Sequence, residues 1–290
     1  MSIAILISVH DGLVLASDSA STLMVKTQKG EQGVVGVYNN ANKIVNLYKG
    51  YPIGCVAFGA GSIGNASIST LLKDFRARLD SKENPPFNIK NYTMKAVANA
   101  LSEFLEAECR QSNVPAPSPP SLGILLAGHS TGKNLGEGWS IQIEGGKAVE
   151  PVPLRAEHEV GISWGGEAEA VVRLILGYGT ALPDVLKNII KTDQPQIISQ
   201  IVALLRQNLQ APVVFPPMPI QDAIDLAEFL VHASIMYSRF TPGAPTVGGP
   251  IEIAAITKHE GFKWVSRKHY YDRQINPEQL RREWLEEEMS

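Results

Sequence analysis

The sequence predicts an α+β fold in which antiparallel sheets are stacked between layers of helices. Four short apolar runs precede the first helical segment, and the remaining segments follow as two helices, strands, two helices and strands. This grouping differs from the strand–helix alternation that builds parallel sheets. We therefore expect neighbouring strands to be joined by hairpins and to pair antiparallel.

The first four strands form two predicted hairpins. "IAILISV" (3–9) and "LVLAS" (13–17) are apolar, rich in branched residues and separated by Asp11-Gly12. Asp-Gly is a strong two-residue turn signal, so the two runs are expected to pair. "KIVNLYK" (43–49) and "PIGCVAFG" (52–59) predict the second hairpin.

Between and after these hairpins, loops, helices and strands follow from local composition. Residues 25–42 are polar and contain several glycines, which predicts a loop. Apolar residues at spacings of three and four predict helices beginning near residues 65 and 92. Strands are predicted next at 121–130, 139–146 and 158–165.

The second half of the chain is expected to be mainly helical before a closing hairpin. The predicted elements are a helix from Glu167, a helical hairpin inserted at 180–217, a long helix at 221–240, strands at 250–258 and 262–268, and a charged helical tail. We divide the chain into one domain over 1–268, which includes this insertion, and a C-terminal tail over 269–290.

Composition excludes several classes of function. The formal net charge is −3 and the 26 Lys and Arg residues are scattered, which argues against a nucleic-acid partner. No run approaches the roughly 18 apolar residues of a membrane span, so no membrane partner and a cytoplasmic location are expected. Cys55 and Cys109 lack metal-ligand spacing, and the histidines do too. No metal and no other cofactor is expected.

The motif "GAGSIG" (59–64) spells a dinucleotide fingerprint between a strand and a helix. Two hairpins precede it, and a second long helix follows before the next strand, whereas the fingerprint belongs to the first strand of a parallel βαβ unit. Glycine used for close strand-to-helix packing is the favoured interpretation. Nucleotide binding stays an alternative.

Two blocks, "DGLVLASDSAST" (11–22) and "NKIVNLYKGYPIGCVAFGAGSIG" (42–64), resemble the proteasome β-subunit and HslV-type family of N-terminal nucleophile (Ntn) hydrolases. Weaker matches extend over nearly the whole chain. The resemblance implies a bacterial-type proteasome-like protein with a four-layer αββα sandwich. It also implies a mature chain that begins with its own nucleophile.

The resemblance assigns catalytic roles to five residues. The family's nucleophile, nine residues before its Asp-Gly turn, falls on Ser2. The family's Asp and buried Lys fall on Asp18 and Lys43, and its oxyanion-binding backbone N–H falls on Gly59. Ser163 is a loose candidate for the supporting serine. Removal of Met1 would leave a hydroxyl and a free α-amine, with a pKa of about 8, on one residue.

The implied function is cleavage of peptide (amide) bonds inside a self-compartmentalised homo-oligomer, a ring or a spiral, with peptides or unfolded proteins as substrates. Phe240 stands where the family has an Asp, and Ala20 where it has an Arg. Two alternatives stay open, the first favoured by the departure at Phe240 and the second permitted by the same catalytic group. One is a catalytically silent assembly subunit, and the other is an Ntn acylase for small non-peptide amides.

Overall fold

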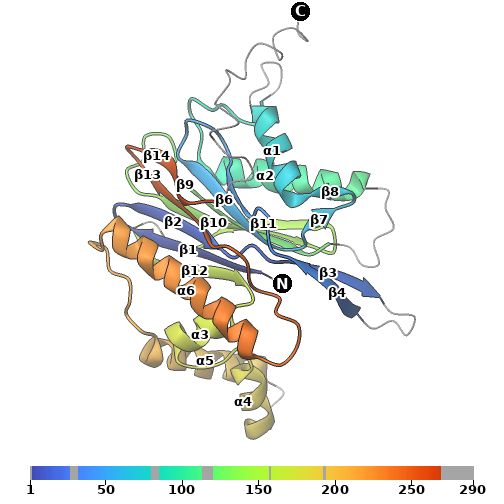
Figure 1. Ribbon diagram of the computed structural model, residues 1–290. Coiled ribbons are helices and arrows are strands. Elements are labelled where there is room, and N and C mark those ends of the chain that lie inside the picture. Colours follow the sequence, from blue (N-terminus) through green and yellow to red (C-terminus); the bar gives the residue numbers. More distant parts are fainter. Residues whose placement is uncertain are drawn as a thin grey trace, which may run out of the picture.

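The computed structural model describes residues 2–26, 32–79, 85–112, 120–156, 158–191 and 194–268. Two five-stranded antiparallel sheets face each other, and helices lie on either side of them (Figure 1). The α+β class and the antiparallel pairing are confirmed. The family's four-layer αββα arrangement stays a prediction.

The first sheet holds the start of the chain at its centre. Every residue of the two strands β1 (Ile3–Val9) and β2 (Gly12–Ser17) is buried. The reason is that α6 (Ile220–Phe240) covers one face of these strands and the second sheet covers the other. The predicted hairpin across Asp11-Gly12 is confirmed. The strand order is β12 (Gly161–Gly166), β1 (Ile3–Val9), β2 (Gly12–Ser17), β13 (Glu252–Thr257) and β14 (Gly261–Ser266).

The second sheet contains the other predicted hairpin. Its strands run in the order β11 (Lys147–Pro153), β10 (Glu137–Glu144), β9 (Leu122–Gly128), β6 (Ile53–Gly59) and β5 (Ile44–Asn46). The β5–β6 hairpin is confirmed, with a shorter first strand than the sequence indicated. Strand β11 was not predicted, because the two prolines and the charges of "KAVEPVP" hide its period-two pattern.

The loop predicted over 25–42 is wrong in part. β3 (Ser21–Lys26) pairs antiparallel with β4 (Gln32–Tyr38) in a separate two-stranded sheet. β4 contains Val34 and Val35, and β-branched residues favour strands even where they are exposed. The surrounding glycines and polar residues concealed this signal.

Two helix pairs cover the sheets. α1 (Ile68–Leu79) and α2 (Met94–Gln111) share a hydrophobic core with the second sheet. α3 (Glu169–Leu176) and α6 (Ile220–Phe240) share another with the first. A third cluster, which includes Leu6, fills the space between the sheets. The short pair β7 (Ser62–Ile63) and β8 (Ala66–Ser67) leads from β6 into α1.

The helical hairpin predicted at 180–217 forms, and its helices are α4 (Leu182–Ile190) and α5 (Pro195–Leu209). Within the described residues, α4 buries no side chain and α5 buries only Ile198. The division of the chain into a domain and a tail stays a prediction, and residues 269–290 lie outside the described residues.

The Phe58 ring packs between the two sheets, against Gly123 on β9 and Gly165 on β12. This packing can be tested by its effect on stability. A Cβ added at Gly123 would lie 2.1 Å from this ring, and one at Gly165 would lie 2.3 Å from it. We expect Gly123→Ala to lower the free energy of unfolding by about 1–3 kcal/mol, because the ring must leave its place. Urea denaturation measures this, with Gly36→Ala as the matched control, since a Cβ there meets nothing within 4 Å. Equal effects of the two variants would contradict the packing described.

Candidate active site

Ser2 is held in place by hydrogen bonds of its own backbone and of its neighbour. It is 5% exposed, and its carbonyl oxygen accepts a hydrogen bond of 2.7 Å from the backbone N–H of Glu167. The Ile3 N–H donates to Asp18 Oδ1 at 3.0 Å, and the Ser17 hydroxyl donates to the Ile3 carbonyl at 2.7 Å. The first residue of the described chain is therefore fixed beside the end of β2.

Asp18 is fully buried and accepts hydrogen bonds from four parts of the chain. Its Oδ1 accepts from the Ile3 N–H and, at 2.6 Å, from Lys43 Nζ. Its Oδ2 accepts from the N–H groups of Ala20 and Gly248, each at 3.0 Å. A carboxylate offers about four lone-pair sites, so its hydrogen-bonding capacity is filled. Such pairing offsets the desolvation of a buried charge.

Lys43 precedes β5, and its side chain is 8% exposed. Burial lowers the pKa of its ammonium from 10.5, because desolvation penalises the charged form, while the attraction of Asp18 works in the opposite direction. Such a lysine gives up its proton more readily than a solvated one. It can therefore help to move a proton to or from a neighbouring hydroxyl.

A pocket of about 360 Å³ contains Ser2, Lys43 and Gly59 in its lining. Gly59 ends β6 with a φ of +90°, and a Cβ at this position would lie 2.7 Å from the Ser121 carbonyl oxygen. Glycine is thus required here for both conformation and space. The structure brings the nucleophile candidate, the lysine and the candidate oxyanion donor into one cavity, with Asp18 directly behind Lys43.

Ser163 lies elsewhere. It is opposite Leu6 in the β1–β12 pair, whereas the β12 residue opposite Ile3 is Gly166. The Ser163 hydroxyl is 3.4 Å from Arg155 Nη2. Arg155 belongs to a different pocket, so the structure does not bring Ser163 to the Ser2 group.

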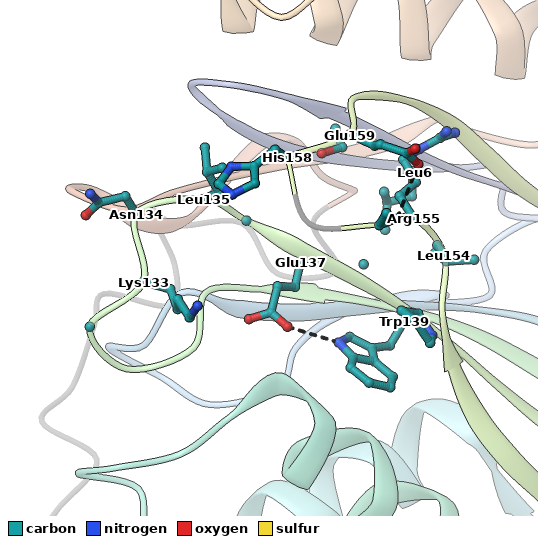
Figure 2. Close-up of a pocket in the computed structure, with 16 residues that line it drawn as sticks. Leu6, Lys133, Asn134, Leu135, Glu137, Trp139, Leu154, Arg155, His158 and Glu159 are labelled. Atoms are coloured by element: carbon teal, nitrogen blue, oxygen red, sulfur yellow. Dashed lines mark hydrogen bonds between the residues drawn. The ribbon is translucent and has the colours of Figure 1, made fainter.

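The pocket that contains Arg155 is larger, about 470 Å³, and is shown in Figure 2. Leu6, Leu154 and Trp139 supply its apolar surface, and the Trp139 indole donates to Glu137 at 3.4 Å. Ser2, Lys43 and Gly59 are not among its lining residues. Size alone does not make this pocket the site of chemistry.

A second buried ion pair lies next to the first, and the sequence reasoning missed it. Lys268 Nζ is 2.8 Å from Glu252 Oε2, and the two side chains are 8% and 2% exposed. The same ammonium donates to the Ser19 hydroxyl at 2.7 Å and to the Ala41 carbonyl at 2.8 Å. Glu252 within the apolar run "PIEIAAIT" was the available signal, because an unpaired carboxylate is rarely buried.

The loop after α6 reaches the site through its backbone. Phe240, which stands where the resemblance expects an Asp, is 74% exposed and does not line the Ser2 pocket. Gly248 instead donates to Asp18, and its carbonyl accepts a 2.9 Å hydrogen bond from the Ser19 N–H. A backbone donor carries no side-chain signal, so the sequence reasoning did not find it.

The structure also bears on the dinucleotide motif, on membrane-spanning helices and on metal ligands. β6, which leads into "GAGSIG", is flanked by antiparallel neighbours, which is not the parallel setting of a dinucleotide fingerprint. Over the described ranges, no helix is long and apolar enough to cross a membrane. The same part of the chain contains no group of three or more His, Cys, Asp or Glu side chains that could hold a metal ion.

No protein-family model matches the chain, and no curated protein matches it. Solved structures do. Anbu (ancestral beta-subunit) from Yersinia bercovieri is 15% identical, with a TM-score of 0.50 over 94% of this chain and 90% of that one. An Anbu (Gly-1) mutant from Hyphomicrobium sp. strain MC1 is 14% identical, with a TM-score of 0.51 over 95% and 92%. A helical assembly of the Anbu complex from Pseudomonas aeruginosa is 13% identical, with a TM-score of 0.50 over 94% of this chain and 90% of that one.

These matches show a proteasome-like fold, and at such identities they show the fold alone. The predicted membership of the proteasome β-subunit and HslV-type family is wrong, because the matching structures are Anbu proteins, a distinct proteasome-like family. The motifs that carried the resemblance are a hairpin turn and strand ends. Such elements belong to the fold and do not separate its families.

The Asp18–Lys43 pair gives a second test. We expect Lys43→Met to lower the free energy of unfolding by about 3–5 kcal/mol, because it leaves the Asp18 charge buried without its partner. Asp18→Asn combined with Lys43→Met removes both charges and should recover part of this loss. Urea denaturation of the two variants and the native chain measures it. A double variant no more stable than Lys43→Met would show that the buried charge is not the cause.

Proposed function

We propose that this chain is an N-terminal serine hydrolase that cleaves amide bonds, with Ser2 as the nucleophile after Met1 is removed. The observation that carries the proposal is the shared pocket. Ser2 lies there beside a buried lysine whose ammonium is 2.6 Å from a fully buried carboxylate. A serine hydroxyl is a weak nucleophile and needs such a basic, electrostatically ordered neighbourhood.

In the proposed reaction, the Ser2 hydroxyl oxygen attacks the substrate carbonyl carbon while the α-amine of Ser2 accepts the hydroxyl proton. The pKa of such an amine is about 8, close to working pH. Lys43 assists this transfer from the same pocket. The oxyanion that forms accepts a hydrogen bond from the Gly59 N–H, a kind of contact worth about 3–4 kcal/mol in other enzymes.

Collapse of this intermediate breaks the carbon–nitrogen bond. The leaving amine takes the proton from the α-amine, and Ser2 keeps the acyl group as an ester. Water, deprotonated by the same amine, then hydrolyses the ester and regenerates the hydroxyl. Asp18 does not react. It fixes Lys43 and the start of β1, so that the reacting groups stay aligned.

Four residues carry this proposal, namely Ser2, Asp18, Lys43 and Gly59. Ser163 is left out, because it lies beside Arg155. The Glu167 N–H, which binds the Ser2 carbonyl, supplies part of the positioning that a supporting serine would give. The remaining orientation of the amine comes from the Ile3–Asp18 hydrogen bond of the next residue.

We infer that the chain works as a homo-oligomer. One of the matching structures is a helical assembly of the Anbu complex, which supports self-association of a chain with this fold. Within such an assembly the substrates would be peptides or unfolded proteins. Small non-peptide amides would suit the same chemistry.

A catalytically silent assembly subunit is the second candidate. The comparisons favour it over peptide hydrolysis, because they support a proteasome-like fold and an assembly and extend no further. The exposed Phe240 in place of the expected Asp also favours it. The buried Asp18–Lys43 pair beside Ser2 favours the hydrolase, since an ion pair out of water is costly to keep and apolar packing would serve structure equally well.

Substitution of Ser2 separates the two candidates. We expect Ser2→Ala to lower kcat by at least about 10³-fold on any amide that the native chain cleaves, because the attacking oxygen is gone. Ser2→Thr keeps a hydroxyl and should retain activity. Release of a fluorescent amine from a panel of peptide and small amides measures this, with Ser62→Ala, at an exposed position of β7, as the control. Turnover that survives Ser2→Ala, or no turnover by any of these chains, would contradict the hydrolase.

A further inference from the structure

The pocket beside Ser2 has a mainly polar lining. Its hydroxyl and amide side chains come from four separate segments, namely the start of the chain at Ser2, the start of β3, the chain just before Lys43 and the passage from β8 into α1. Ala57 and Gly61, which also line the pocket, are small and leave room for a substrate group. The polar members of the lining include Ser21, Thr22, Asn40, Asn42, Ser69 and Thr70. Such a surface suits a hydrogen-bonding ligand better than an apolar one.

The charge of this lining is positive. Two lysines, Lys43 and Lys73, contribute to it, and no carboxylate side chain is found among its described residues. Asp18 compensates Lys43 at 2.6 Å. Lys73, on the exposed face of α1, forms no ion pair with any residue in the described ranges. One positive charge at the pocket is therefore uncompensated.

The beginning of α1 adds to this preference for negative charge. Its first turn, with Ser69 and Thr70, forms part of the pocket wall. The N-terminal end of a helix carries a partial positive charge. In α1 two of the first N–H groups already donate hydrogen bonds, that of Ile68 to the Gly61 carbonyl and that of Thr70 to the Ser67 hydroxyl. The Ser69 hydroxyl oxygen is buried and has no hydrogen-bond partner in the part of the chain that the structure describes. Ser69 belongs to the pocket lining.

We propose that this pocket selects substrates whose acyl group carries a carboxylate, with Lys73 as the residue that determines the selectivity. The inference rests on the proposed function, because it takes the pocket beside Ser2 as the place of the acyl group. Two kinds of substrate share this chemistry. One is a peptide cleaved after Glu or Asp, and the other is the monoamide of a small dicarboxylic acid.

The test compares a charged acyl group with its neutral isostere. A blocked peptide coumarylamide ending in Glu is measured against the same peptide ending in Gln, and a glutaryl anilide against the corresponding amide. We expect kcat/KM to favour the carboxylate by about tenfold or more in at least one of the two pairs, and added salt to reduce the ratio. The pair that shows the preference identifies the kind of substrate.

Variants of Lys73 test its role. Lys73→Met should lower the carboxylate-to-amide ratio about tenfold, and Lys73→Glu should invert it. The matched control is Lys95→Met, which removes another exposed positive charge, from α2 outside the pocket, and should leave the ratio unchanged. Equal kcat/KM for charged and neutral substrates, or a ratio that Lys73→Glu does not alter, would overturn the proposal.

Failure of the hydrolase itself gives a different result, in which neither member of a pair is cleaved. In that case, a binding measurement tests whether the pocket prefers a carboxylate. The full chain carrying Ser2→Ala is titrated with N-acetylglutamate and with N-acetylglutamine by calorimetry. Selective binding of the carboxylate that Lys73→Glu abolishes would support the anion pocket. Equal binding or no binding of both would contradict it.

Discussion

The candidate site depends on the hydrogen bonds that the buried Asp18 carboxylate accepts. It accepts hydrogen bonds from the backbone of Ile3, Ala20 and Gly248 and from the Lys43 ammonium. Four segments that are distant in the sequence thus meet at two oxygen atoms. Taking a carboxylate out of water costs several kcal/mol, and only a complete set of donors offsets this. The position of Ser2, one residue before Ile3, follows from the same constraint.

The second ion pair extends this constraint to the rest of the pocket. Lys268 binds Glu252 on β13 and also the Ser19 hydroxyl and the Ala41 carbonyl, which flank the chain on either side of β3 and β4. Each pair joins one positive and one negative side chain, so the two pairs together add no net charge to the interior. The positive charge of Lys268 lowers the pKa of Lys43 further, and the negative charge of Glu252 raises it. Among the described residues, the lysine of the pocket wall that has no ion-pair partner is Lys73.

Sequence reasoning found the parts of this site that lie close together in the chain. Ser2 and Asp18 border the first hairpin, and its turn fixes their registration, while Lys43 directly precedes β5, the first strand of the second predicted hairpin. Gly248 and the Glu252–Lys268 pair were missed, because a backbone N–H has no residue signature and the pair brings β13 and the chain just after β14 together only in the folded protein. The hairpin β3–β4 was not predicted, because glycines and polar residues mask its strand pattern. The family within the fold could not be predicted either, because turn motifs are shared across the families of this fold.

The most direct test of the account is the intact mass of the purified full chain before and after incubation with a β-lactone, which acylates nucleophilic hydroxyls. The account predicts a chain without Met1 that gains one inhibitor mass, and it predicts no gain for Ser2→Ala. Such a result would place the nucleophile on the residue that Asp18 holds in position. A chain that keeps Met1 and gains no mass would contradict the account and would favour the silent assembly subunit.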